Sequence, residues 1–387
     1  MSGTYNRRLV FWSACLGMLL FGIGLITLGA ILPDLRIRHS LSAVEAGTLF
    51  SILPIGIIAG SLLFGPVCDR YGYRVLLAIS SVLMFAGFEG LAFTHSAWIL
   101  TLSVFLIGIG GGAVNGATNA VVADISTTGK GADLSLLGVF FGIGALGMPL
   151  LLSVLKQSFD FQVIVAATGF IALAATVLFL IVRFPPAKQA EGLSMKQIGL
   201  MMKDLTLLMI AFFLFFQSAF EGLINNWTTT YLMERVAAPQ SAALMGLSAY
   251  IAGMTVMRLL IGSIFRKMPA RTLLYTSFAI TFVALMLFRL SGSMIPAAAG
   301  LFLIGAGVAA GFPTMLGFVG NRYPYISGTA FSFVLVIALL GNMLVNYSMG
   351  LVAENYGIKH LTTFTFAELI ILVAIAAVIF RRLKQTK

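Results

Sequence analysis

Three groups of polar side chains occur at helical spacing within long apolar stretches of this sequence. They are Asn115 and Asn119, then Gln217, Glu221 and Asn225, and finally Asn342 and Asn346. Residues four apart project from the same face of an α-helix, so each group forms a polar stripe. Side-chain amides carry paired donors and acceptors, which suit the hydroxyl groups of a small polar solute. These residues are therefore candidates for substrate binding, and the alternative for the asparagines is hydrogen bonding between helices.

Glu221 and Trp227 suggest two further kinds of chemistry. A glutamate removed from water can take up and release a proton near physiological pH, so Glu221 is a candidate for ion coupling. It can equally be a permanently ionised partner for an arginine, a substrate or sodium, or a structural partner for another helix. Trp227 offers apolar ring surface to a sugar, with Tyr231 one turn further along. The alternative for Trp227 is an aromatic anchor at the membrane interface.

The elements that carry these residues are predicted to be membrane spans. The chain has 387 residues, of which 59% are hydrophobic and 10% are charged, whereas about a quarter of a soluble domain is charged. Twelve apolar runs reach the roughly 18 to 25 residues needed to cross a hydrocarbon core about 30 Å thick. The runs are 9–33, 43–64, 75–94, 97–122, 133–155, 161–182, 205–229, 241–264, 272–291, 294–318, 326–352 and 361–380. The short loops between them leave no room for a catalytic or nucleotide-binding domain. We therefore expect an all-α integral membrane protein that is not an enzyme.

The positive charges indicate how the spans are oriented. Of the 24 lysines and arginines, seventeen fall on the side of the N-terminus, six fall on the other side, and Arg258 lies within a span. Cytoplasmic segments carry the excess of Lys and Arg, so both termini are expected in the cytoplasm. The net charge of +11 then reflects topology and does not point to nucleic acid. Neither the two cysteines nor the three histidines cluster at metal-ligand spacing, so no metal or cofactor is expected.

An internal repeat divides the chain into two halves. The segment SLLFGPVCDRYGYRVLL, residues 61–77, aligns without gaps with RLLIGSIFRKMPARTLL, residues 258–274. At the same offset FLIGIG, residues 105–110, aligns with FLIGAG, residues 302–307. Duplication of a six-span unit explains why both pairs of segments align at the same offset. An even number of spans in each unit gives the two copies the same orientation in the membrane. We therefore expect pseudo-symmetric six-helix bundles at 1–183 and 204–387, joined by a polar cytoplasmic linker at 184–203.

The first copy of the repeated segment resembles the G-x-x-x-D-R-x-G-x-[RK] signature of the major facilitator superfamily. The matching residues are Gly65, Asp69, Arg70, Gly72 and Arg74, in the loop between the second and third runs. The resemblance implies secondary transport by alternating access, with the substrate held between the two halves.

The resemblance also implies that this loop is a conformational latch. Asp69 is expected to meet the N-terminus of the eleventh span, where the helix dipole favours an anion. Arg74 is expected to pair with Asp124 at the cytoplasmic end of the fourth span. The alternative is that Arg70 and Arg74 only set the orientation of the chain. In the second copy Arg266 replaces Asp69, so we expect that copy to keep the turn without an anionic latch.

Three shorter pieces are similar to the fucose and glucose/galactose permease group, which includes sodium-glucose-transporter-like members. They are the E-x5-W-x3-Y pattern of Glu221, Trp227 and Tyr231, the GFPTML segment at 311–316, and Asn119. Two positions depart from that group, because Asn115 stands where Glu or Gln is usual and the first run has no acid at its middle. These departures place proton coupling by the fucose permease route in doubt, and leave open sodium coupling or coupling through Glu221 alone.

Together these features predict a monomeric sugar:cation symporter in a plasma membrane, in bacteria the inner membrane. Its partners would be a small-molecule sugar, a proton or sodium ion, and the lipid bilayer. An exporter of drugs or metabolites is the alternative within transport, although amide-lined cavities favour polar solutes. A membrane receptor or a membrane enzyme is a further alternative, which explains neither the latch signature nor the repeat.

Overall fold

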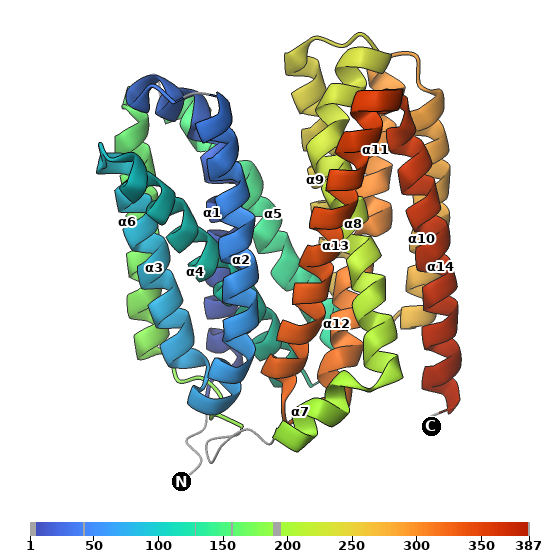
Figure 1. Ribbon diagram of the computed structural model, residues 1–387. Helices are drawn as coiled ribbons and strands as arrows, with labels where there is room; N and C mark the ends of the chain where they lie inside the picture. Colours follow the sequence, from blue (N-terminus) through green and yellow to red (C-terminus); the bar gives the residue numbers. More distant parts are fainter. Residues whose placement is uncertain (1–4, 42, 128, 156–157, 189–194, 386–387) are drawn as a thin grey trace. The chain divides into compact units, whose positions relative to one another are not determined.

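The computed structural model describes residues 5–41, 43–127, 129–155, 158–188 and 195–385, and it is built from α-helices (Figure 1). Over that part of the chain there are fourteen α-helices, one 3-10 helix and no strand. Twelve segments within the same residues are long and apolar enough to cross a membrane. The predicted all-α membrane fold with twelve spans is therefore confirmed.

The helices of the first half are α1 (Arg7–His39), α2 (Ala43–Tyr71), α3 (Tyr73–Phe93), α4 (Ala97–Ile125), α5 (Lys130–Leu155) and α6 (Phe161–Ile181). Those of the second half are α7 (Met195–Met202), α8 (Leu205–Arg235), α9 (Gln240–Gly262), α10 (Ala270–Leu290), α11 (Met294–Val308), α12 (Gly311–Arg322), α13 (Ser327–Tyr356), η1 (Ile358–His360) and α14 (Leu361–Gln385). The short helix α7 follows the predicted linker region, of which residues 189–194 lie outside the described residues.

One predicted span is made of two helices. The run 294–318 forms α11 and α12, with a break at Ala309 and Ala310. Pro313 has no N–H group to donate to a preceding carbonyl but is tolerated in the first turn of a helix, so a new helix begins beside it. At the break, the carbonyl of Val308 accepts a hydrogen bond from the Gln217 side chain on α8 at 3.0 Å.

The helices form two compact units. Unit 1 contains Met1–Ser126, Phe140–Met195 and Tyr323–Ser332, and unit 2 contains Thr127–Val139, Lys196–Arg322 and Phe333–Lys387. The first turn of α13 is therefore part of unit 1, and the first turns of α5 are part of unit 2. These units group helices by contact and do not define where the chain passes from one domain to the next. The domain boundaries predicted at 183 and 204 therefore stay a prediction.

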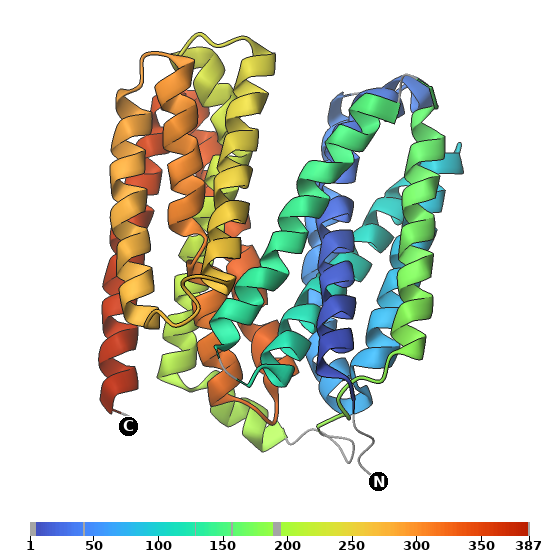
Figure 2. The same ribbon diagram turned by 180° about the vertical axis from the view of Figure 1, so that it is seen from behind.

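Within each unit, one or two central helices organise the packing. In unit 1, α4 packs against α1, α2 and α3, and α3 also packs against α6 (Figures 1 and 2). The approach of α2 to α4 is close, because a Cβ atom at Gly108 would lie 2.6 Å from the carbonyl oxygen of Leu53. In unit 2, α11 packs against α9 and α10, while α8 packs against α9 and α14. The polar side chains of α4 and α8 are thereby carried by helices that pack against several others in their unit.

Candidate functional site

The polar stripe of α8 begins at a buried glutamine. Gln217 is 1% exposed, and its Nε2 atom donates to Glu221 Oε1 at 2.9 Å as well as to Val308. Asn225 is exposed, and its side-chain nitrogen donates to the main-chain carbonyl of Glu221 at 2.8 Å. The stripe therefore runs from the interior of unit 2 to an exposed amide, with the half-buried carboxylate of Glu221 between them.

Glu221 has a cationic neighbour on α9. The side chain of Arg258 is 8% exposed, and its guanidinium group interacts electrostatically with Glu221. The phenol of Tyr250, also on α9, is buried near both groups. Arg258 further donates to the main-chain carbonyl of Gly138 at 3.4 Å. An arginine partner for Glu221 is one of the alternatives that its sequence position allows, and Arg258 is the residue that the fold brings near it.

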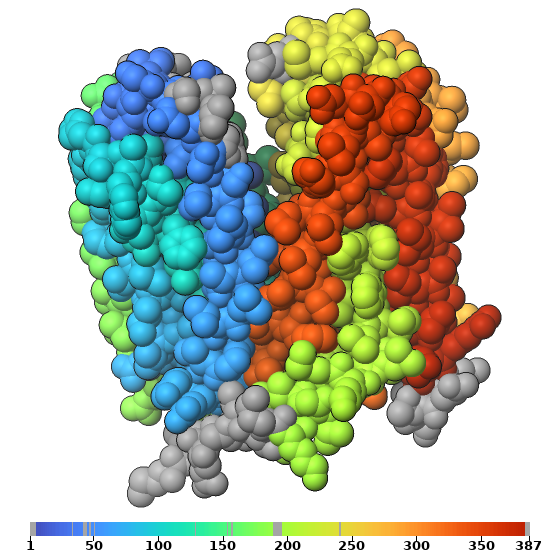
Figure 3. Space-filling model, viewed as in Figure 1, coloured from blue at the N-terminus to red at the C-terminus, as the bar shows by residue number. Residues whose placement is uncertain are grey.

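The two asparagines of α13 bond to α8. Side chains of α8 and α13 lie next to each other on one face of unit 2 (Figure 3). Asn342 Nδ2 donates to the carbonyl of Ser218 at 3.0 Å. Asn346 Oδ1 accepts from Asn226 Nδ2 at 3.0 Å and from the indole nitrogen of Trp227 at 3.2 Å. These are the interhelical bonds that sequence analysis gave as the alternative, and a substrate role for Asn342 and Asn346 stays a prediction.

The α4 asparagines belong to unit 1 and bond to each other. Asn119 is 6% exposed, and its Nδ2 atom donates to the Asn115 carbonyl at 2.8 Å and to Asn115 Oδ1 at 3.1 Å. Asn115 is half-buried. The stripe predicted from their spacing is therefore present, and Asn115 is its more accessible member.

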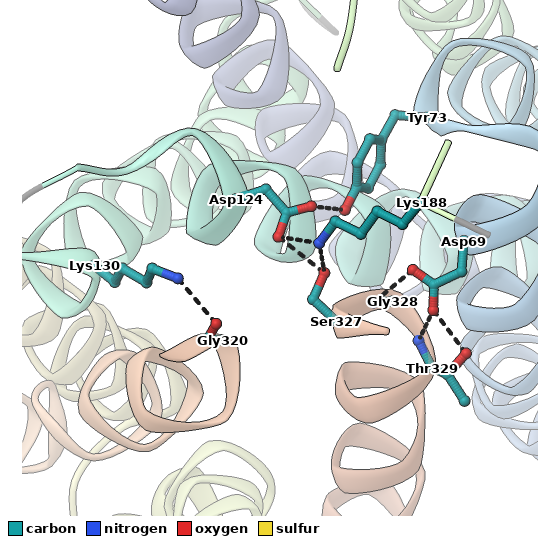
Figure 4. Close-up of polar contacts among 9 residues, drawn as sticks. All are labelled: Asp69, Tyr73, Asp124, Lys130, Lys188, Gly320, Ser327, Gly328 and Thr329. Atoms are coloured by element: carbon teal, nitrogen blue, oxygen red, sulfur yellow. Dashed lines mark hydrogen bonds and ion pairs between the residues drawn. The ribbon is translucent and has the colours of Figure 1, made fainter. Parts of the chain in front are cut away.

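In unit 1, Asp69 at the end of α2 caps the N-terminus of α13 (Figure 4). Its Oδ1 atom accepts from the Gly328 N–H at 3.1 Å, and its Oδ2 atom accepts from the N–H and the hydroxyl of Thr329, both at 2.7 Å. Asp69 is 1% exposed. A helix leaves its first N–H groups without partners and carries partial positive charge there, so a carboxylate stabilises that end. The expected meeting of Asp69 with the eleventh span is thus formed, and its role as a latch stays a prediction.

The expected pair of Arg74 with Asp124 is wrong. Asp124 Oδ1 accepts from Lys188 Nζ at 2.6 Å and from Ser327 Oγ at 2.9 Å, while its Oδ2 atom accepts from the Tyr73 hydroxyl at 2.5 Å (Figure 4). Arg74 instead donates to the Leu180 carbonyl on α6. Consecutive residues of a helix point about 100° apart, so Tyr73 takes the direction of α4 and Arg74 turns away from it.

Lys188 is the residue that sequence analysis missed at this position. It comes from the segment that follows α6, and its Nζ atom also donates to Ser327 Oγ at 2.6 Å. No spacing rule links a linker lysine to a carboxylate 64 residues earlier. The signal that was available is chemical, because a carboxylate predicted at a span end needs a cation and Lys188 lies in a short polar linker on the same predicted side.

The other signature residues have separate structural roles. A Cβ atom at Gly65 would lie 2.6 Å from the Gly328 carbonyl oxygen, so only glycine lets α2 approach α13 this closely. Gly72 has φ of 82°, which glycine adopts readily, and it makes the turn between α2 and α3. Arg70 is exposed, with its guanidinium carbon 5.2 Å from the centre of the Tyr71 ring. The alternative that Arg70 only sets the orientation of the chain therefore stays a prediction.

The second copy of the segment forms an ionic contact of its own within unit 2. Arg266 binds the Asp133 carboxylate in the first turn of α5 at 2.7 Å. In the same turn, Lys130 Nζ donates to the Gly320 carbonyl at the end of α12 at 2.9 Å (Figure 4). The second copy thus has no anion at the position of Asp69, as expected from its sequence, and the cation that stands there binds an anion on the facing helix.

The chemistry available to these residues is hydrogen bonding and charge pairing. Among the described residues, no group of three or more His, Cys, Asp or Glu side chains is placed to hold a metal ion. The amides of α4 and α8 supply donors and acceptors, and Glu221 with Arg258 supplies a charge pair whose balance a proton, a cation or a polar solute would change.

Comparison with known protein families identifies the group to which this arrangement is similar. Residues 14–346 match the family model described as Major Facilitator Superfamily. The multidrug resistance protein MdtG of Proteus mirabilis is 26% identical over 375 residues, covering 92% of each chain. The glucose/mannose transporter GlcP of Bacillus subtilis is 22% identical over 341 residues, covering 85% of this chain and 84% of its own.

Comparison with solved structures shows the same fold. A crystal structure of FucP in the outward conformation superposes with a TM-score of 0.80 at 17% identity, covering 95% of this chain and 98% of FucP. FucP is the fucose:proton symporter of E. coli. At this identity the similarity establishes the fold alone.

Proposed function

Because the chain belongs to the major facilitator superfamily of membrane transporters, we propose that it carries a sugar or a similar small polar solute together with a cation. The observation that supports this proposal is the arrangement on α8, where Gln217, Glu221 and Asn225 form one stripe beside Arg258. Charged and polar groups inside a membrane are costly, and they mark substrate and ion pathways.

The substrate class follows from the side chains that remain available. Asn225 and Asn115 are the accessible members of their stripes, and amides can both donate to and accept from hydroxyl groups. Two similar transporters are named for sugars, GlcP for glucose and mannose and FucP for fucose. A solute with several hydroxyl groups is therefore the substrate class that we propose.

We assign ion coupling to Glu221. Its carboxylate accepts from an amide on one side and lies near the guanidinium of Arg258 on the other. Protonation or sodium binding would change the charge balance of this pair, and a polar solute that bonds to either group would sense the change. The coupling ion in this proposal is a proton or sodium.

The latch is part of the same proposal. The contacts of Asp69 with α13 and of Asp124 with Lys188 and Ser327 would hold one conformation of the transport cycle and break in the other. We place the protein as a monomer in the plasma membrane, with both termini and these contacts on the cytoplasmic side. The excess of Lys and Arg on the side of the termini supports that orientation.

Export of drugs or metabolites is a second candidate function. It is favoured by the full-length similarity to MdtG, which is named a multidrug resistance protein. Exporters of lipophilic cations need apolar pocket surface, so the two candidates differ in the solute that would compete at the α8 stripe.

Transport into proteoliposomes tests both candidates. The purified protein is reconstituted, and uptake of a panel of radiolabelled sugars is measured with proton and sodium gradients imposed separately. Accumulation of a sugar under one gradient supports symport and identifies the ion. Absence of sugar accumulation under both gradients, combined with gradient-driven movement of a lipophilic cation, would replace symport with export.

A further inference from the structure

The indole ring of Trp227 is held against α13 by two residues one helical turn apart. Its Nε1–H group donates to Asn346 Oδ1 at 3.2 Å. Its six-membered ring lies over Gly350, where a Cβ atom would be 3.7 Å from Cζ2 and 3.8 Å from Cη2. The hydrogen bond holds one edge of the indole, and Gly350 leaves room for the other edge because it has no Cβ atom. We call Asn346 and Gly350 the indole seat.

Asn346 is itself fixed by other amides. Its Nδ2 atom donates to the Asn342 carbonyl at 2.9 Å and to Asn342 Oδ1 at 3.2 Å, and Asn342 is tied to the Ser218 carbonyl on α8. Gly222 makes room for this chain of bonds, because a Cβ atom there would lie 2.5 Å from Asn342 Nδ2 and 2.6 Å from Asn346 Nδ2. The acceptor that orients the indole therefore has little freedom to move.

The seat decides which chemistry Trp227 can offer. Indole has one donor and no acceptor, and in this structure Asn346 uses the donor. What remains is ring carbon surface, and the side chain is half-buried, so part of that surface is open. Aromatic surface of this kind packs against apolar C–H groups, as the less polar face of a pyranose ring presents them.

We propose that Asn346 and Gly350 are positioning residues that hold Trp227 so that its ring carbons, and not its N–H group, contact the apolar C–H face of the transported solute. This inference rests on the proposed transport of a small polar solute and names the part of that solute which α8 would recognise. It also gives Asn346 a role other than direct substrate binding.

Transport kinetics of three variants test the proposal with the solute that the wild-type protein carries. Trp227→Phe removes the N–H group, and Asn346→Leu removes its acceptor, so each change frees the ring and should raise KM about two- to tenfold, the size of an aromatic contact. Turnover should change by less than about twofold, because a binding contact is lost and not a step of the cycle. The double variant should have the KM of either single variant, because both changes break the same bond.

Two further variants distinguish displacement of the indole ring from a general loss of folding. Gly350→Val introduces methyl groups that reach the ring and should raise KM as Asn346→Leu does, with no polar group removed. Ser348→Ala serves as the matched control, because Ser348 is an exposed neighbour on α13 whose hydroxyl donates within its own helix to the Leu344 carbonyl. Additive effects of Trp227→Phe and Asn346→Leu on KM would overturn the proposal, since they would mean that Asn346 contacts the solute itself.

Fluorescence tests the indole seat independently of transport. Trp12 and Trp98 are 59% and 70% exposed, so replacing both with phenylalanine leaves Trp227 as the sole reporter. Asn346→Leu and Gly350→Val should then lower the fluorescence anisotropy of Trp227 relative to Ser348→Ala, without any solute present. Unchanged anisotropy would overturn the seat even if transport were normal. A protein that carries no polar solute but shows the anisotropy loss would leave the seat standing and overturn the proposed function.

Discussion

At the scale of single residues, Glu221 is placed between a neutral donor and a cation. Gln217 donates to one carboxylate oxygen at 2.9 Å, and Arg258 approaches from α9. A protonated Glu221 would keep the hydrogen bond from Gln217 but lose its electrostatic attraction to Arg258. This difference makes the two possible roles of Glu221, proton carrier and ionised ligand, separable by one substitution.

Glu221→Gln mimics the protonated carboxyl permanently. If Glu221 carries the coupled proton, solute binding and exchange should persist in the variant, while accumulation driven by a pH gradient should be lost. If it is an ionised ligand for solute or sodium, binding should be lost as well, because charge-assisted hydrogen bonds are about twice as strong as neutral ones. Exchange and gradient-driven uptake are measured in the same proteoliposomes.

The control for Glu221 is a second buried acid in unit 2. Glu368 on α14 is 4% exposed, and Glu368→Gln should keep gradient-driven accumulation. Normal accumulation in Glu221→Gln would return Glu221 to the structural alternative, in which it only links helices.

Lys188 is a second residue whose removal should have a defined cost. The Asp124 side chain is 8% exposed, so losing its cation leaves a nearly buried charge, whose remaining donors among the described residues are the Tyr73 and Ser327 hydroxyls. Breaking a buried pair from one side costs roughly 3 to 5 kcal/mol, and the two hydroxyls reduce that to about 2 kcal/mol. Lys188→Met should lower the melting temperature of the detergent-solubilised protein, and Asp124→Asn in the same chain should restore it.

The matched control for this measurement is Lys196→Met, which removes an exposed lysine near the start of α7. Its melting temperature should equal that of the wild-type protein. Equal destabilisation by Lys188→Met and Lys196→Met, or no rescue by Asp124→Asn, would mean that the Lys188–Asp124 pair contributes nothing beyond general surface charge.

At the scale of elements, the first turn of α13 covers a native cysteine. Cys68 is 2% exposed, and its sulfur lies directly against Gly328. We expect a conformation in which α13 leaves α2 to expose this thiol. Alkylation of Cys68 in a Cys15→Ala background therefore reports the contact between α2 and α13 without an introduced probe.

Asp69→Asn should increase the rate of Cys68 alkylation. The substitution keeps one acceptor but removes the negative charge from the N-terminus of α13, a loss of about 1 to 2 kcal/mol. That is roughly a 5- to 30-fold larger population of the open arrangement. Transport turnover should fall while expression stays unchanged. An alkylation rate equal to that of the wild-type protein would contradict the latch role of Asp69.

The sequence was sufficient for the elements and for part of the contacts between them. Spans are dictated by bilayer thickness, so apolar run length predicts them without tertiary information. The contact of Asp69 with α13 was predictable because the signature loop and the helix dipole both point to it. The break between α11 and α12 was not predicted, although Pro313 and Gly311 carried the signal in the sequence.

Contacts that depend on the direction of a side chain could not be predicted from the sequence. Tyr73 and Arg74 are adjacent, and only the rotation of α3 decides which of them faces Asp124. Likewise, spacing shows that Asn342 and Asn346 share a face, but the partner of that face is set by the packing of α13 on α8. A one-residue rotation exchanges partners at no cost in hydrophobic pattern, so pattern analysis cannot choose between them.

At the scale of the whole molecule, the internal repeat places a contact of opposite polarity in each unit. In unit 1 an anion on α2 binds the start of α13, and in unit 2 Arg266, which follows α9, binds an anion at the start of α5. The two contacts differ in burial, because Asp69 is 1% exposed while the side chains of Arg266 and Asp133 are 36% and 18% exposed. Partly exposed ion pairs contribute about 0.2 to 1 kcal/mol. The buried contact in unit 1 should therefore contribute more free energy than the contact in unit 2.

We expect both contacts to act in one conformational change. Since α5 and α13 each continue from one unit into the other, opening of one contact should favour opening of the other. Arg266→Asp, which sets two carboxylates against each other in unit 2, should then raise the alkylation rate of Cys68 in unit 1 by about two- to fivefold at low salt. Adding Asp133→Arg should reverse the increase by restoring an ion pair of swapped polarity. At about 1 M salt, where the screening length is about 3 Å, all three proteins should converge. If the Cys68 alkylation rate of Arg266→Asp at low salt equals that of the wild-type protein, the contact in unit 2 belongs to a different step of the transport cycle.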